Sequence, residues 1–172
     1  MKITKKFADG EQMKELPVRK KQRLAGYDYS KSGYYFVTLC IKDKRELLGK
    51  INVGATAPGR PHVELTPLGE CVDETINKAT KDDVRIDKYV IMPNHIHMII
   101  AIDAGDRGRS PLQGIVRNIK SFVSKWAGSS PWQKSFHDHI IRDRIEYQRI
   151  WQNIHDNPAL WTQDKYYIPD KP

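Results

Sequence analysis

Two histidines, His95 and His97, flank a single isoleucine in a stretch that otherwise has the apolar composition of a β-strand. Because successive side chains of a strand point to opposite faces, we expect both imidazoles on one face and Ile96 on the other. Two imidazoles about 7 Å apart on one face can share a metal ion. The pair alone is equally consistent with two half-exposed strand histidines, so its meaning depends on the surrounding elements.

The elements next to the histidines predict an antiparallel hairpin. Residues 84–92 alternate apolar and polar side chains, Pro93-Asn94 forms a short link, and residues 95–102 continue as a second strand. Strands linked this closely pair antiparallel, which places the histidines in the sheet near its turn. Residues 34–41 are β-branched and aromatic, as in an interior strand. We expect residues 46–53 to form a short strand paired back on 34–41.

Capping residues predict three helices. Thr66-Pro67 combines an N-cap hydroxyl with proline at the first helical position, and the helix should extend to about residue 80. Ser110-Pro111 starts a second helix in the same way. Asp143, with Glu146 at the capping-box position, starts a third that ends at Asn157-Pro158. The second and third helices have apolar stripes predicted to be buried: Leu112, Ile115, Val116, Ile119, Phe122, Val123 and Trp126, then Tyr147, Ile150, Trp151 and Ile154.

The net charge of +8, from 29 Lys and Arg against 21 Asp and Glu, indicates an anionic partner. Residues 1–24 contain eight basic and three acidic side chains, so this arm carries +5 of that charge. A basic arm is either a nucleic-acid-binding device or a solvated tail. A basic helix face likewise either contacts phosphates or is simply solvated. The candidate DNA-contacting residues of the arm and of the second helix are Lys20, Lys21, Arg23, Arg117, Lys120 and Lys125.

The 172 residues fit one domain with two extensions: a basic arm (1–24), a core domain (25–161) and a C-terminal tail (162–172). No apolar run approaches the roughly 18 residues of a membrane helix, and we expect no signal peptide because the N-terminus is polar and Lys-rich. We therefore expect a cytoplasmic protein, associated with the nucleoid if its partner is DNA. Cys40 and Cys71 form no metal-binding spacing and are expected to be reduced and buried.

Several short motifs occur together between residues 26 and 161. They are Gly26-Tyr27-Asp28-Tyr29, Tyr35-Phe36-Val37-Thr38, residues 90–97, Lys120-Ser121-Phe122, residues 132–142 and residues 154–158. In these motifs and their order the chain resembles the REP-associated tyrosine transposases, relatives of the single-tyrosine insertion-sequence transposases of the His-hydrophobic-His (HUH) class. Each motif is common, whereas the combination is specific.

The resemblance implies an α+β fold with a ferredoxin-like or RRM-like central antiparallel sheet, helices packed on it, and a homodimer. It implies single-stranded or hairpin DNA as the partner. In such enzymes two strand histidines hold a divalent ion at the scissile phosphate, and a helix tyrosine attacks that phosphate to form a 5′-phosphotyrosine link. Magnesium or manganese is the implied ion, since the substrate supplies hard oxygen ligands.

Carried over residue by residue, the resemblance makes His95 and His97 the metal pair and Asn157 the third, amide ligand. The nucleophilic tyrosine should stand four residues before that asparagine, one helical turn away. Here that position is Asn153, and an amide cannot act as this nucleophile. Strand cleavage has been lost naturally, a designed change has removed it, or another tyrosine acts. Tyr147 is the nearest substitute, but six residues of about 100° each place it about 240° around the helix from position 153.

Three functions follow from these observations. The first is a transposase-like protein that binds metal and single-stranded or hairpin DNA, with its chemistry impaired at Asn153. The second is a domesticated, non-catalytic DNA-binding protein that uses the basic arm and the basic helix face. The third is a metal-dependent hydrolase in which the two histidines activate water, although no carboxylate ligand is evident near them in the sequence. Tyr166 and Tyr167 reach any site at the histidines only if the tail folds back.

Overall fold

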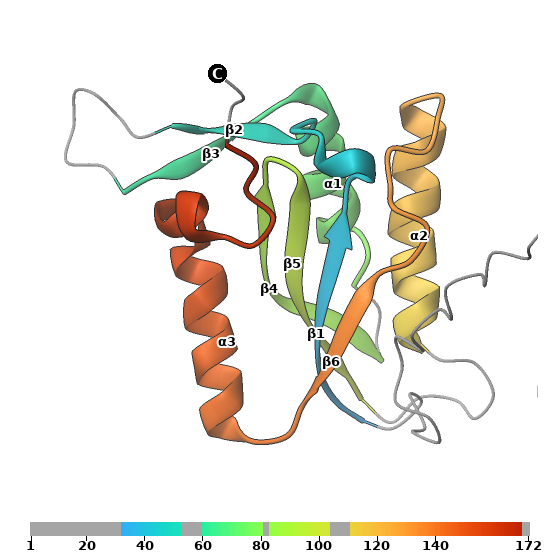
Figure 1. Ribbon diagram of the computed structural model, residues 1–172. Helices are drawn as coiled ribbons and strands as arrows, with labels where there is room; N and C mark the ends of the chain where they lie inside the picture. Colours follow the sequence, from blue (N-terminus) through green and yellow to red (C-terminus); the bar gives the residue numbers. More distant parts are fainter. Residues whose placement is uncertain (1–31, 53–59, 81–82, 104–110, 170–172) are drawn as a thin grey trace, which may run out of the picture.

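The computed structural model describes residues 32–52, 60–80, 83–103 and 111–169. Its centre is an antiparallel sheet of four strands in the order β4-β5-β1-β6 (Figure 1). The strands are β1 (Gly33–Cys40), β4 (Val84–Met92), β5 (His95–Ile102) and β6 (His137–Ile141). The basic arm (1–24), residues 53–59 and 104–109, and Ser110 lie outside the described residues. The predictions made for the arm and for Ser110 therefore stay predictions.

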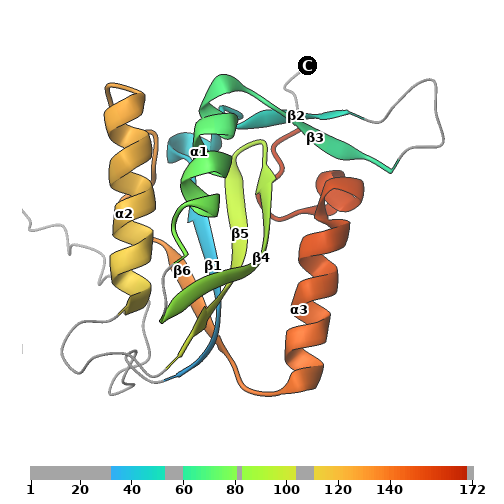
Figure 2. The same cartoon turned by 180° about the vertical axis from the view of Figure 1, so that it is seen from behind.

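Helices cover both faces of this sheet, so the described residues have the α+β architecture that was predicted (Figures 1 and 2). One face carries α1 (Pro67–Asn77) and α2 (Pro111–Trp126), and the other carries α3 (Arg144–Asp156). Among the described helices, none has the length and apolar character needed to span a bilayer.

Strand β5 separates the two layers because its side chains alternate. Ile96, Met98 and Ile100 belong to the main core beneath α1 and α2, while Ile99 packs on the other side with residues of α3. The histidines share the face of Ile99 by this alternation, as the sequence predicts. All eight residues of β5 are buried.

Strand pairing fixes what lies next to the histidines. Strands β4 and β5 form the predicted antiparallel hairpin, with Met92 opposite His95 across the Pro93-Asn94 turn. Strand β1 is interior, since it pairs with β5 on one side and β6 on the other. Its register with β5 places Thr38 opposite His97.

One strand prediction is wrong. Residues 46–53 were expected to pair with β1, but β2 (Gly49–Asn52) pairs with β3 (His62–Leu65) in a separate two-stranded sheet. The reason is that both edges of β1 are already hydrogen-bonded to β5 and β6. Strand β2 instead pairs with β3, the next strand in the sequence, as neighbouring strands commonly do.

The helix caps largely follow the sequence. The hydroxyl of Thr66 accepts from the backbone N–H of Gly69, and α1 ends at Asn77 rather than near residue 80. The carboxylate of Asp143 accepts from the N–H of Glu146 at 2.8 Å and caps α3. The predicted capping box is incomplete, because the Glu146 carboxylate accepts from the N–H of Arg142 rather than from that of Asp143.

Two aromatic residues predicted to be buried on α2 are exposed. Phe122 is 57% exposed and Trp126 is 55% exposed. Phe122 lies at the margin of the helix stripe and Trp126 is the last residue of the helix, so neither reaches the sheet. The other stripe residues of α2 are buried as predicted: Leu112, Ile115, Val116, Ile119 and Val123. Cys40 and Cys71 are both free and buried.

Candidate metal centre

His95 and His97 lie side by side on the α3 face of the sheet, at the start of β5. Their ring centroids are 4.4 Å apart and the rings meet edge to face. His95 is fully buried and His97 is 7% exposed. The strand pleat therefore brings two imidazoles together in an environment from which solvent is largely excluded.

Hydrogen bonds to both Nδ1 atoms orient these rings. Asn94 donates through Nδ2 to the carbonyl oxygens of Lys44 (3.2 Å) and Tyr166 (2.9 Å), which leaves its Oδ1 to face His95 Nδ1 at 2.9 Å. Since Oδ1 can only accept, His95 carries its proton on Nδ1 and has a lone pair on Nε2. His97 Nδ1 contacts the hydroxyl of Thr38 at 2.9 Å, which likewise leaves Nε2 available.

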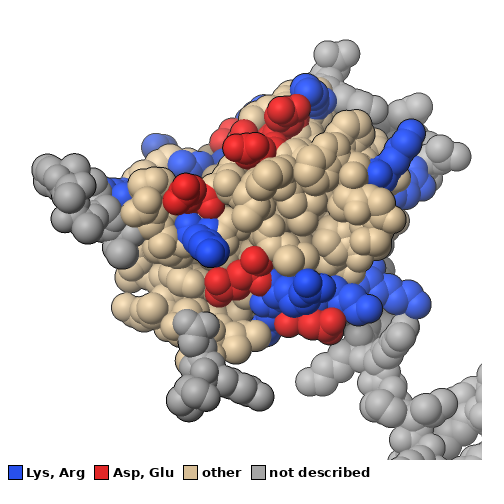
Figure 3. All heavy atoms as spheres, turned by 90° about the horizontal axis from the view of Figure 1, so that it is seen from above, with Lys and Arg blue, Asp and Glu red and all other residues tan. Residues whose placement is uncertain are grey.

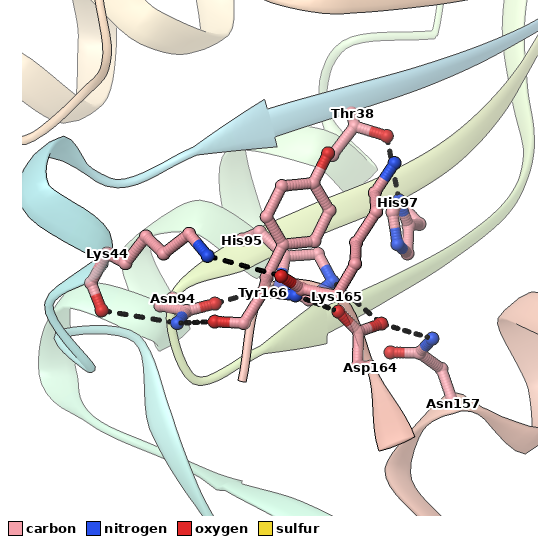
Figure 4. A network of polar contacts seen from close by, with 9 residues as sticks. All are labelled: Thr38, Lys44, Asn94, His95, His97, Asn157, Asp164, Lys165 and Tyr166. Atoms are coloured by element: carbon pink, nitrogen blue, oxygen red, sulfur yellow. Dashed lines mark hydrogen bonds and ion pairs between the residues drawn. The ribbon is translucent and has the colours of Figure 1, made fainter. Parts of the chain in front are cut away.

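Acceptor atoms converge on the Nε2 side of the histidines. Asp164 Oδ2 lies 3.9 Å from His95 Nε2 and accepts a hydrogen bond from Asn157 Nδ2 at 3.1 Å. Figure 4 shows Asp164 between His95 and Asn157. His95 Nε2 and Asn157 Oδ1 are both buried without a hydrogen-bond partner among the described residues. Unpaired buried acceptors of this kind are costly.

The arrangement fits a divalent cation. One ligand atom from each of His95, His97 and Asp164 can be chosen so that all lie within 4.8 Å of one another. Two ligands of one ion lie at most about 4.4 Å apart when each bond is about 2.2 Å long, so small side-chain rotations are sufficient. The cation would satisfy the acceptors that no donor of the described residues reaches.

The protonation state of the histidines suits metal binding. Burial, followed by the charges of Lys165 and Lys44, lowers the pKa of His95 to about 3. Burial also lowers the pKa of His97 well below its usual value, and His95 contributes to this shift. Both imidazoles are therefore neutral at physiological pH, which is the form that binds metals.

The end of α3 positions Asn157. Ile150 and Ile154 pack against the sheet beside Ile99, which fixes the helix on this face. Arg60, next to β3, binds the carboxylate of Asp156 and approaches the ring of His155, which are the last two residues of α3. Asn157 then begins a 3-10 helix, η2 (Asn157–Gln163), which turns the chain back toward β5.

The chain after η2 folds back over the histidines, so the condition stated for the tail tyrosines is met by Tyr166. Its ring lies 4.5 Å from that of His95 and 6.0 Å from that of His97, measured between centroids. Its hydroxyl is directed toward Thr38 (Figure 4). Sequence reasoning did not include Asp164 or Tyr166 among the site residues. One sequence feature could have pointed to Asp164, namely its position as an acidic residue between the aromatic residues of the tail.

The structure does not bring the two predicted nucleophile positions, Asn153 and Tyr147, together at the histidines. Asn153 is exposed on α3, one turn before Asn157 and so on the same side of the helix. Tyr147 donates from its hydroxyl to the carboxylate of Asp87. Burial and this hydrogen bond raise the pKa of Tyr147 to about 12. Asp87 lies four to five strand residues from the level of His95, about 15 Å along the sheet.

The described basic residues proposed for DNA contact lie on α2, across the sheet from the histidines. Arg117 and Lys125 are exposed, whereas Lys120 donates to the carbonyl oxygen of Gln133 at 2.6 Å. Burial lowers the pKa of Lys120. Seen from the end of the molecule near the β4–β5 turn, Lys and Arg side chains alternate with Asp and Glu around an uncharged centre (Figure 3). The largest group of Lys and Arg side chains in that view lies along one edge of the face, beside Asp and Glu side chains.

Replacing Asn94 tests the orientation of His95. We expect Asn94→Ala to weaken Mn²⁺ binding by about tenfold to a hundredfold, because His95 loses the acceptor that fixes its tautomer. Calorimetric titration measures the affinity, and ¹⁵N NMR of the ring should show both tautomers. Asn118→Ala, on exposed α2 surface, is the matched control. An affinity within about twofold of the parent would contradict this role.

Comparison with known proteins identifies the family. No protein-family model matches the chain. A Haemophilus influenzae protein described as uncharacterized is 35% identical over 175 residues, covering 87% of this chain and 93% of that protein. The REP-associated tyrosine transposase of Escherichia coli K12 is 25% identical over 132 residues, covering 76% and 69%. A solved REP-associated tyrosine transposase bound to a REP hairpin superposes with a TM-score of 0.57 at 25% identity, over 77% of this chain and 70% of that one. The chain belongs to the family of REP-associated tyrosine transposase-like proteins.

Proposed function

We propose that this protein is a transposase-like DNA-binding protein that holds a divalent ion through His95, His97 and Asn157. One observation carries the proposal: the Nε2 atom of His95 and the Oδ1 atom of Asn157 are buried acceptors on the same face of the sheet, and neither has a partner in the described part of the chain. Magnesium or manganese is the proposed ion. When bound, it would polarise the oxygens of a phosphodiester.

The proposed partner is single-stranded or hairpin DNA. Support comes from the family, in which one solved relative is bound to a REP hairpin. The basic arm (1–24) supplies most of the net charge and is the proposed phosphate-contacting element, together with Arg117 and Lys125. We further propose a homodimer that works in the cytoplasm at the nucleoid. Binding should weaken steeply as salt concentration rises.

Among the described residues, no phenol is placed to attack DNA at the predicted position. Asn153 offers an amide, and the hydroxyl of Tyr147 is held by Asp87. The hydroxyl of Tyr166 turns away from Asp164 toward Thr38 (Figure 4). We therefore propose that binding of metal and DNA is retained and that strand cleavage through a phosphotyrosine is lost at Asn153.

Restoring the tyrosine tests this proposal. A labelled hairpin with a single-stranded flank is incubated with the protein and Mn²⁺, and covalent protein–DNA adducts are sought on a denaturing gel. We expect no adduct from the parent and an adduct from Asn153→Tyr, because the exposed position accommodates a longer side chain. Asn153→Phe, which has the ring without the hydroxyl, is the control.

Other outcomes of the same gel would contradict the proposal. An adduct formed by the parent and abolished by Tyr147→Phe or Tyr166→Phe would identify a substitute nucleophile. In a separate binding assay, hairpin binding that needs neither the histidines nor a metal ion would favour the non-catalytic DNA-binding function instead.

Metal-dependent hydrolysis remains a second candidate because of Asp164. Sequence reasoning ranked it last for want of a carboxylate near the histidines, and the structure places one 3.9 Å from His95 Nε2. Two imidazoles and a carboxylate form the donor set of many hydrolytic metal sites. Hydrolysis predicts a cleaved strand without an adduct in the parent protein.

A further inference from the structure

We propose that the carboxylate of Asp164 is itself a ligand of the divalent ion, so that the segment after η2 completes the metal centre. The proposal rests on the proposed function, because it adds a ligand to the same site. It changes the donor set from two imidazoles and an amide to one that also includes an anionic oxygen.

The Asp164 carboxylate faces a lone pair of His95 in a buried site. Asn94 holds the proton of His95 on Nδ1, so Nε2 presents a lone pair toward Asp164 Oδ2 at 3.9 Å. Two acceptors that face each other in a buried site repel one another. A divalent ion between the two atoms would turn this repulsion into two favourable bonds.

The Asp164 carboxylate is also held in place for this role. Its side chain is 8% exposed, and its Oδ1 accepts from the backbone N–H of Tyr166 at 2.7 Å. Its Oδ2 accepts from Asn157 Nδ2, which leaves a second lone pair on Oδ2 to face the histidines. Ligand carboxylates that are themselves hydrogen-bonded are typical of metal sites. The same two contacts would also serve a carboxylate that only stabilises the turn after η2, and the experiment must separate these roles.

An added carboxylate has a defined effect on metal choice. A neutral set of two imidazoles and an amide attracts cations weakly, whereas a carboxylate contributes a full negative charge close to the ion. Carboxylate oxygens suit hard ions such as Mg²⁺ and Mn²⁺, while imidazoles alone favour later transition metals. Asp164 is therefore the residue that makes the proposed ion chemically suitable for this site.

The test compares metal affinity of the full chain with and without this carboxylate. We expect Asp164→Asn to weaken Mn²⁺ binding by at least about tenfold in calorimetric titration, since removal of supporting groups already costs about tenfold to a hundredfold. The asparagine keeps the Oδ1 acceptor for Tyr166 and removes only the anionic charge that faces the histidines. Asp103→Asn, which removes the same charge from an exposed side chain, should bind within about twofold of the parent.

A second measurement uses the unmodified protein, so it does not depend on the variant folding. With ¹³C-labelled aspartate, addition of Mg²⁺ should shift the carboxyl resonance of Asp164 and leave that of Asp103 in place. An unshifted Asp164 resonance at saturating metal overturns the inference.

The outcomes separate this inference from the function on which it rests. If His95→Ala abolishes Mn²⁺ binding but Asp164→Asn does not weaken it, the carboxylate only stabilises the turn, and the proposed function stands. If the parent protein binds neither ion, both proposals fail.

Discussion

Lowering the pH from about 7 to about 5 should reduce the free energy of unfolding of the metal-free protein by about 2 kcal/mol through His95, and His97 should add a loss of the same sign. Burial lowers the pKa of both histidines in the folded protein, that of His95 to about 3. In the unfolded chain both take up protons near their ordinary pKa of about 6.5. The stability due to the neutral histidines is therefore present above about pH 6.5 and is lost as the pH falls toward the folded pKa.

Denaturant titrations in the presence of a chelator, repeated at several pH values, measure this effect. In a double variant, His95→Gln with His97→Gln, neither side chain titrates, so the loss between the two pH values should shrink by at least about 2 kcal/mol. His62→Gln changes an exposed histidine and should leave the parent's pH dependence in place. The histidine assignment fails if the double variant loses as much stability as the parent.

Gly69→Ala is expected to destabilise the fold by about 3 kcal/mol, the upper part of the range for an overpacked core. A Cβ atom at Gly69 would lie 2.0 Å from the carbonyl oxygen of Leu48 and 3.2 Å from Cβ of Leu65. The Leu48 backbone cannot move away easily, because its N–H donates to Pro93 and its carbonyl accepts from Thr66. The first turn of α1 therefore needs glycine at this contact.

A matched glycine in α2 provides the control. A Cβ atom at Gly114 would meet nothing within 4 Å, so Gly114→Ala should stabilise the protein by about 0.5–1 kcal/mol through its helix propensity. The two substitutions thus have opposite expected signs in the same denaturation assay. A loss below about 1 kcal/mol for Gly69→Ala would show that the Leu48 segment yields.

The parts of the fold that were predicted correctly depend on local signals. The β4–β5 hairpin follows from a two-residue link between alternating runs, and the start of α1 follows from the Thr66 cap. The partner of β2 could not be predicted, because it depends on which strands already occupy the edges of β1. Phe122 was misplaced because helix periodicity gives the direction of a side chain but not whether another element covers it.

Local signals also explain which residues of the candidate site could be named from the sequence. His95 and His97 share one strand, so their common face follows from the pleat, and Asn157 was named from a motif at a helix end. Asp164 depends on a reversal of the chain after η2, and no periodic pattern marks its destination. Tyr166 was named only conditionally, since its position depends on the same reversal.

The side chain of Asn94 also bears on the order of folding events. It joins carbonyl groups 50 and 72 residues away in sequence, and the Thr38–His97 contact spans 59 residues. Contacts between residues this far apart form slowly, because the intervening chain must first give up its conformational freedom. During synthesis, Asp164 and Tyr166 also leave the ribosome only after the strands that they cover. The metal centre is thus expected to mature as a late step, on a sheet that has already formed.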